Sequence, residues 1–101
     1  MSPKYTNTKI AGLVLYFTRR CIVECFHAHA AKSMGDVGGA AKFFVYEDGS
    51  TKVMDKGRLT PKQIREVQRY IKTNHVDMFK FWKEEDGKPE YFDTVPKITL
   101  E

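Results

Sequence analysis

The sequence has little of several features that would define its class at once. It has only two cysteines, Cys21 and Cys25, which are too few for a disulfide-built secreted scaffold. Its most apolar stretches, IAGLVLYF and CIVECF, are far shorter than the roughly 20 residues that cross a bilayer. The start of the chain also lacks the flanks of a signal peptide. These absences predict a protein of the reducing cytoplasm with no membrane partner.

What remains is the composition of one folded domain. The chain has 101 residues, of which 42% are hydrophobic and 13% are aromatic, enough for a modest core. We expect a flexible N-terminal tail over residues 1–8, a single domain over 9–92 and a C-terminal tail over 93–101. The formal net charge of +4 favours acidic partners, nucleic acid among them. The same excess of lysine would also serve solubility alone.

Three stretches predict strands. Residues 10–17 form an apolar run rich in strand formers, and residues 26–30 favour a second strand. Residues 41–55 contain two strand-like runs joined by Glu-Asp-Gly-Ser, the composition of a tight hairpin turn. We therefore expect a small antiparallel sheet of three or four strands.

The periodicity then changes to that of a helix. Thr60 can cap its start, Pro61 suits the first helical position, and Gln63 completes a capping box. Five apolar residues then fall on one stripe that would face the sheet: Ile64, Val67, Ile71, Met78 and Trp82. The weak helix formers at 73–75 predict a break followed by a second short helix. The fold class expected is α+β, with the sheet packed against one or two C-terminal helices.

The second helical segment is unusually aromatic. Phe79 and Phe81 point to different sides of it, so a single sheet cannot cover both. We expect one of them to mark an exposed apolar patch of the kind that binds a partner.

The candidate site is the alternating segment CFHAHA. On an extended strand Cys25, His27 and His29 share one face, with about 6.6–7 Å between successive members. Two neighbours can converge on one zinc ion, but Cys25 and His29, about 13 Å apart, cannot. A third ligand would have to come from elsewhere, and the donors considered are His75, Asp77, Asp36 and Glu24.

The preferred interpretation is instead that His27 and His29 are hydrogen-bonded structural residues on a half-buried face. The sequence therefore predicts no cofactor outright and leaves zinc as an alternative. His75 is kept with His27 and His29 as the candidate site. Both cysteines are expected to be buried and unreactive, since little around them would lower a thiol pKa.

A second candidate surface is the polar side of the helix that begins at Thr60. Its basic residues recur at spacings of three or four and form a stripe opposite the apolar one: Lys62, Arg65, Arg69 and Lys72. Such a stripe could contact phosphates, although any amphipathic helix also needs a solvated face.

The order of these features carries a resemblance. Three features follow one another along the chain: Phe26-His27-Ala28-His29, Gly57-Arg58-Leu59 and Trp82. They resemble, in the same order, the Pro-His-aromatic-His segment, the Gly-x-Leu and the late Trp of an uncharacterised family of small bacterial proteins, domain of unknown function 4160. The likeness covers roughly residues 10–85. This chain lacks the usual prolines before the first histidine, and Ala28 replaces the aromatic residue.

The resemblance implies an α+β fold and a bacterial intracellular setting. Some relatives are encoded beside another small domain, as toxins and antitoxins are, which implies a small protein partner. Three interpretations stay open: an interaction module, which is preferred, a metal-dependent hydrolase or nuclease using His27 and His29, and a nucleic-acid-binding protein using the basic stripe. Enzyme activity is left undecided, leaning towards none, and the sequence does not define an oligomeric state.

Overall fold

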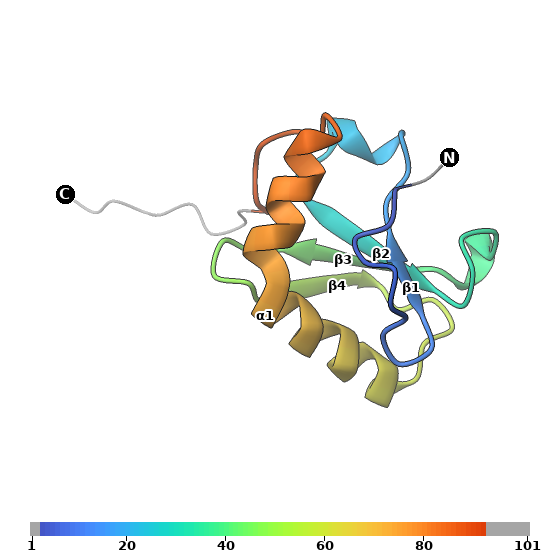
Figure 1. Cartoon of the computed structure of the whole chain (residues 1–101). Coiled ribbons are helices and arrows are strands. Elements are labelled where there is room, and N and C mark those ends of the chain that lie inside the picture. Colours follow the sequence, from blue (N-terminus) through green and yellow to red (C-terminus); the bar gives the residue numbers. More distant parts are fainter. Residues whose placement is uncertain (1–2, 93–101) are drawn as a thin grey trace.

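The computed structural model describes residues 3–92 and has the expected α+β architecture. One four-stranded antiparallel sheet, in the order β1-β2-β3-β4, is followed by one long helix (Figure 1). The strands are β1 (Val14–Tyr16), β2 (His27–Ala31), β3 (Ala41–Val45) and β4 (Thr51–Asp55), and the helix is α1 (Pro61–Glu84). Two short 3-10 helices, η1 (Cys21–Val23) and η2 (Val37–Gly39), lie in the connections on either side of β2.

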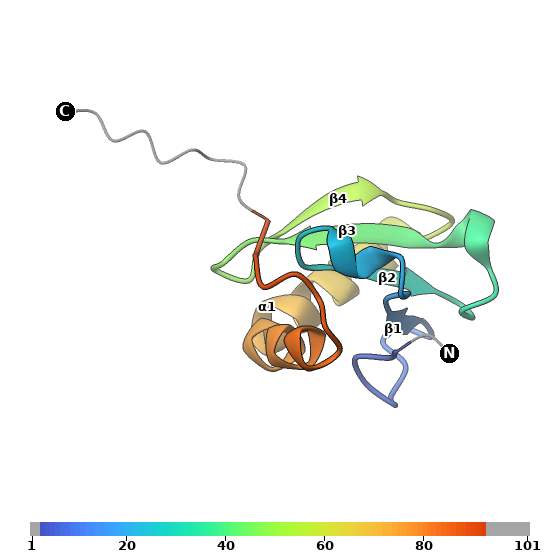
Figure 2. The same cartoon turned by 90° about the horizontal axis from the view of Figure 1, so that it is seen from above.

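The two faces of the sheet have different roles. Seen from above, α1 lies along one face (Figure 2), where Ala28 and Ala30 of β2 belong to the buried core. Because successive side chains of a strand point to opposite faces, His27 and His29 lie on the other face. The candidate site still borders the core, because the His27 ring lies 5.4 Å from the ring of Trp82 in α1 and Cys21 belongs to the core cluster.

The core forms between α1 and the sheet. The side chains with no exposed area include two from α1 and three from the strands: Val67, Ile71, Ala28, Phe43 and Val45. Trp82, also fully buried, lies near the end of α1, where its Nε1 donates a hydrogen bond of 2.7 Å to the carbonyl of Lys88. Burial of this apolar area is the main source of stability.

The start of α1 is capped as the sequence predicts. The Thr60 hydroxyl accepts a hydrogen bond from the Gln63 amide at 3.1 Å, and the Gln63 side chain accepts one from the Thr60 amide at 3.0 Å. Although α1 has 24 residues, no helix within residues 3–92 is both long and apolar enough to cross a membrane.

The break expected at 73–75 is wrong, because α1 continues through these residues. Asn74 donates its side-chain amide to the Tyr70 carbonyl at 2.8 Å, one helical turn back. Ile71 and Met78, on either side of the weak segment, are both buried against the core. Tertiary packing of the flanking turns thus outweighs the low helix propensity of three residues.

Two further expectations fail because Tyr5 and Tyr91 pack against other parts of the domain. The flexible tail predicted over residues 1–8 is not loose at Tyr5, whose hydroxyl donates to the His27 carbonyl at 2.7 Å. Phe81 meets the Tyr5 ring, and Phe79 stacks on Tyr91 at 4.1 Å. Neither phenylalanine is therefore the exposed patch that was expected. The tail predicted over 93–101 lies outside the described residues.

Candidate metal centre

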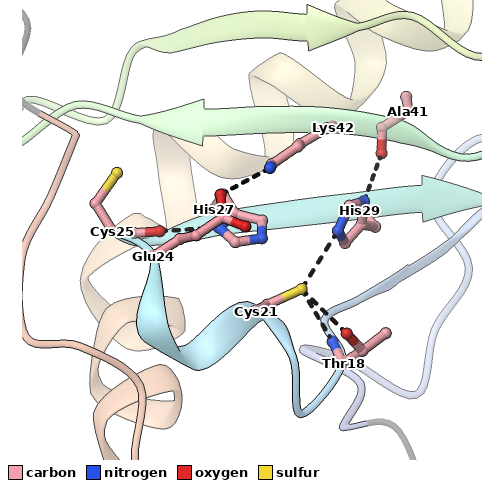
Figure 3. Close-up of polar contacts among 8 residues, drawn as sticks. All are labelled: Thr18, Cys21, Glu24, Cys25, His27, His29, Ala41 and Lys42. Atoms are coloured by element: carbon pink, nitrogen blue, oxygen red, sulfur yellow. Dashed lines mark hydrogen bonds and ion pairs between the residues drawn. The ribbon is translucent and has the colours of Figure 1, made fainter.

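Cys21 supplies the third group that His27 and His29 lacked. It begins η1, in the connection between β1 and β2, and its side chain lies over the sheet face that carries the two histidines (Figure 3). The thiol sulfur and one nitrogen of each imidazole all lie within 4.8 Å of one another. Cys21 Sγ and His29 Nε2 lie 3.4 Å apart. Three groups that can ligate a soft or borderline metal ion therefore meet at one point.

A tight turn puts Cys21 in this position. The Cys21 amide donates to the Thr18 carbonyl at 2.9 Å, and the Glu24 amide donates to the Cys21 carbonyl at 2.9 Å. Thr18 also contacts the sulfur itself, through its amide at 3.4 Å and its hydroxyl at 3.2 Å. Just after the turn, the Phe26 amide donates to the carbonyl of Glu90, in the segment that follows α1, at 2.7 Å. The thiol is thus oriented by backbone contacts before any ligand binds.

Backbone carbonyls determine which imidazole nitrogen carries the proton. His27 Nδ1 lies 2.8 Å from the Cys25 carbonyl, and His29 Nδ1 lies 3.2 Å from the Ala41 carbonyl. A carbonyl can only accept, so both Nδ1 atoms donate, and each neutral ring keeps an Nε2 lone pair. A carbonyl on the second nitrogen is also the usual support of a metal-bound histidine.

His27 Nε2 is the one unexplained polar atom of this cluster. His27 is fully buried, and among the described residues this nitrogen alone is a buried side-chain nitrogen or oxygen without a hydrogen-bond partner. Leaving such an atom unpaired costs about 1–3 kcal/mol. A bound cation would use its lone pair and remove this cost.

The spacing is close to that of a zinc site. With Zn–N near 2.0–2.1 Å and Zn–S near 2.3 Å, tetrahedral angles place ligand atoms roughly 3.3–3.6 Å apart. The sulfur and His29 Nε2, at 3.4 Å, already meet this spacing. The 4.8 Å limit on the other pairs means that at most about 1.2–1.5 Å would have to close when zinc binds.

Both groups at the short contact are biased towards their ligating forms. Burial raises the pKa of the Cys21 thiol, but the neighbouring His27 imidazole and Thr18 lower it, and the net pKa lies below its ordinary value. Burial lowers the pKa of His29, and nearby Lys42 lowers it further. Thiolate and neutral imidazole are the forms that bind metal.

A pocket of about 260 Å³ opens beside His29. Its floor is one row of cross-strand neighbours that spans all four strands: Tyr16, His29, Lys42 and Asp55. Thr18, Met34 and Ala40 complete the lining. His29 lines this pocket, whereas Cys21 and His27 do not, so a small molecule would approach the cluster from the His29 side.

The other ligand candidates from the sequence are elsewhere. His75 lies on α1, where its Nδ1 contacts the Lys72 carbonyl at 3.0 Å and its ring lies 6.1 Å from that of Tyr91. Asp36 pairs with Arg58 at 3.0 Å, and Glu24 pairs with Lys42 at 2.8 Å.

Neither His75, Asp77 nor Cys25 belongs to the cluster. The Cys25 side chain points away from it (Figure 3). The grouping of His75 with His27 and His29 is therefore wrong, because α1 covers the opposite face of the sheet.

Sequence reasoning missed Cys21 and treated it as an unreactive core thiol. The sequence feature that could have indicated it is that Cys21 lies only six residues before His27. A turn from Thr18 to Glu24 brings it back over the strand. Linear spacing along a straight strand could not reveal this third group, because it comes from a preceding loop. Cys21 is nevertheless only 5% exposed, so the expectation of burial holds for it, whereas Cys25 is only partly buried.

The predicted basic stripe lies on the outer side of α1, away from this cluster. Lys62, Arg65, Arg69 and Lys72 are all exposed. Arg69 pairs with Glu66 at 3.2 Å, and Lys72 donates to the Asp48 carbonyl at 2.8 Å. The two candidate surfaces are thus separate.

Comparison with known proteins gives no indication of the function of this cluster. No family model, curated protein or solved structure matches this chain.

Proposed function

We propose that Cys21, His27 and His29 bind one zinc ion and that this centre hydrolyses a small polar substrate. The observation that carries the proposal is the convergence of three ligand atoms within 4.8 Å. The Nδ1 atom of each ring donates to a backbone carbonyl, His29 Nε2 faces the Cys21 sulfur, and His27 Nε2 has no partner. Three protein ligands with a fourth position open to solvent are typical of catalytic zinc, whereas structural zinc has four protein ligands. Zinc in such a site supplies an activated water at neutral pH.

The pocket beside His29 supports a small substrate. Its volume of about 260 Å³ lies just below the usual range of pockets for drug-sized ligands. Polar groups from Tyr16, Thr18, Lys42 and Asp55 line it, and they offer both donors and acceptors to a bound molecule. Lys42 is held by Glu24 at 2.8 Å, so its charge is partly balanced. A polar substrate of modest size fits this lining better than a polyanion.

The positions of the basic residues and of His29 favour a hydrolase of small substrates over a nuclease. A nucleic acid held by the basic residues of α1 would lie on the far side of the sheet from His29. It could not contact that surface and the pocket at once without wrapping around the domain.

Zinc content decides the first part of the proposal. The tag-free protein, expressed in zinc-containing medium, is expected to carry about one zinc per chain by mass spectrometry of the metal. Cys21→Ser and His27→Ala should each lose it, whereas His75→Ala, a matched histidine outside the cluster, should keep it. A content near zero in the parent, or equal loss in His75→Ala, would refute the site.

Turnover decides the second part. The zinc-loaded protein should hydrolyse at least one of a set of small chromogenic esters, amides and phosphate esters, and chelation should abolish this activity until zinc is restored. Bound zinc without any hydrolysis across the set would refute the catalytic role. A reduced Cys21 is required throughout, and the cytoplasm that we propose as the compartment would maintain it.

A second candidate function is a thiol nucleophile. The lowered pKa of Cys21 and its 3.4 Å contact with His29 Nε2 are features of a cysteine–histidine pair. The thiol is only 5% exposed and does not line the pocket, which favours the metal centre. Rapid alkylation of Cys21 by iodoacetamide in the metal-free protein, unchanged by added zinc, would reverse this preference.

The interaction-module interpretation rests on the sequence resemblance. Within residues 3–92 the exposed large apolar side chains are Val23, Met54 and Val76. They belong to three different elements, η1, β4 and α1, so they supply no obvious apolar patch for the small protein partner that the resemblance implies. The metal centre therefore has the stronger physical support.

A further inference from the structure

The continuity of α1 lengthens the basic stripe beyond the four residues visible in the sequence pattern. At about 100° per residue, a sector about 80° wide on the outer side of the helix contains seven positions. Six are basic and the seventh is Val76: Lys62, Arg65, Arg69, Lys72, Lys80 and Lys83. We call this surface the α1 basic face. A break at 73–75 would have left Lys80 and Lys83 on a separate helix with its own direction.

Most charges of this face are available to a ligand, although Lys72 donates to the Asp48 carbonyl and Lys83 lies 4.8 Å from the Phe79 ring. All six basic residues are exposed, and among the described residues only Arg69 of the six forms a salt bridge, with Glu66. Acidic residues of α1 lie beside the sector and not within it: Glu66, Asp77 and Glu84. The helix thus separates its charges around its circumference.

The face points away from the rest of the molecule. The α1 residues with the least exposure, Val67, Ile71, Met78 and Trp82, lie on the opposite side of the helix, against the sheet. The Cys21, His27 and His29 cluster lies beyond the sheet on its other face. The α1 basic face is therefore independent of the proposed metal centre.

We propose that the α1 basic face binds the phosphate backbone of duplex nucleic acid. From Lys62 to Lys83 it spans about 32 Å at 1.5 Å per residue, the length of roughly nine base pairs. Single-strand binders add aromatic side chains on which bases stack, and protein interfaces have buried aromatic or apolar anchors. The face has no aromatic residue and one valine, so regularly spaced phosphates on a rigid duplex are its best match.

The experiment is fluorescence anisotropy with a labelled random-sequence duplex DNA of about 20 base pairs. If four of the six cations meet phosphates, the slope of log K against log salt is about −3.6. Raising the salt from about 50 to about 200 mM would then lower the affinity roughly 150-fold. A duplex RNA of the same length distinguishes the two sources of the phosphate backbone, and binding of either supports the proposal.

Two double variants with the same change in net charge separate the face from general attraction. Arg65→Glu with Lys80→Glu should weaken binding at least about tenfold and make the slope less negative by about 1.8. Lys32→Glu with Lys52→Glu alters exposed lysines outside α1 and should change affinity less than about threefold. Circular dichroism confirms that each variant is folded.

Three outcomes would overturn the proposal: no binding at 100 µM protein in about 50 mM salt, equal weakening by the two double variants, or preference for a single strand over either duplex. His27→Ala should leave duplex binding unchanged. Failure of this proposal is therefore distinguishable from failure of the metal centre.

Discussion

Replacing His27 by leucine tests whether its buried nitrogen is reserved for a ligand. The substitution deletes the hydrogen bond of 2.8 Å to the Cys25 carbonyl, which contributes about 1 kcal/mol. It also deletes the unpartnered Nε2, whose burial costs about 1–3 kcal/mol. Leucine has a similar volume and fills the same fully buried position. The balance predicts that metal-free His27→Leu is as stable as the parent, or more stable by up to about 2 kcal/mol.

Zinc should then distinguish the two proteins. Free zinc at 100 times its dissociation constant adds about 2.7 kcal/mol to the parent, and His27→Leu should gain almost none of this. Urea unfolding in chelator and in zinc buffer measures both quantities, with His75→Leu as a variant that keeps the gain. A loss above about 2 kcal/mol in chelator would mean that His27 is a satisfied structural residue. Retention of the zinc gain by His27→Leu would show that the ion binds elsewhere.

Three further predictions follow from the described contacts. Burial lowers the pKa of His29 from its ordinary 6.5, so the unfolded chain binds more protons than the folded one between the two pKa values. The contribution of His29 to metal-free stability is therefore complete above pH 6.5 and is lost as the pH falls through that interval. Urea unfolding should show a flatter pH dependence of stability in His29→Gln. Thr60→Ala removes the cap bond to Gln63 and should cost about 1 kcal/mol, seen as a lower urea midpoint with unchanged slope, whereas Thr73→Ala, at an exposed mid-helix site, should not destabilise. Gly57→Ala should lower the free energy of unfolding by about 2 kcal/mol or more, because Gly57 has φ +54° and a Cβ would meet the Gly39 carbonyl oxygen. The control is Gly35→Ala, which has open space around it. A smaller decrease in melting temperature for Gly57→Ala than for Gly35→Ala would contradict this.

Local patterns predicted the elements whose cause is local. The capping box at Thr60 and Gln63 and the hairpin around Gly49 were readable because neighbouring residues form them. The second strand was predicted within one residue of its observed start and end, at His27 and Ala31. The helix break at 73–75 failed because intrinsic propensity is weak compared with the burial of Ile71 and Met78.

For the site, the sequence by itself determined that His27 and His29 share a strand face, since alternation along a strand is a property of the backbone. Only the tertiary structure decided which other side chains lie near the two histidines. The turn from Thr18 to Glu24 brings Cys21 over that face, while α1 takes His75 to the other side of the sheet. Contacts of this kind depend on how a loop and a helix close on the sheet, and residue spacing along one strand does not encode that closure.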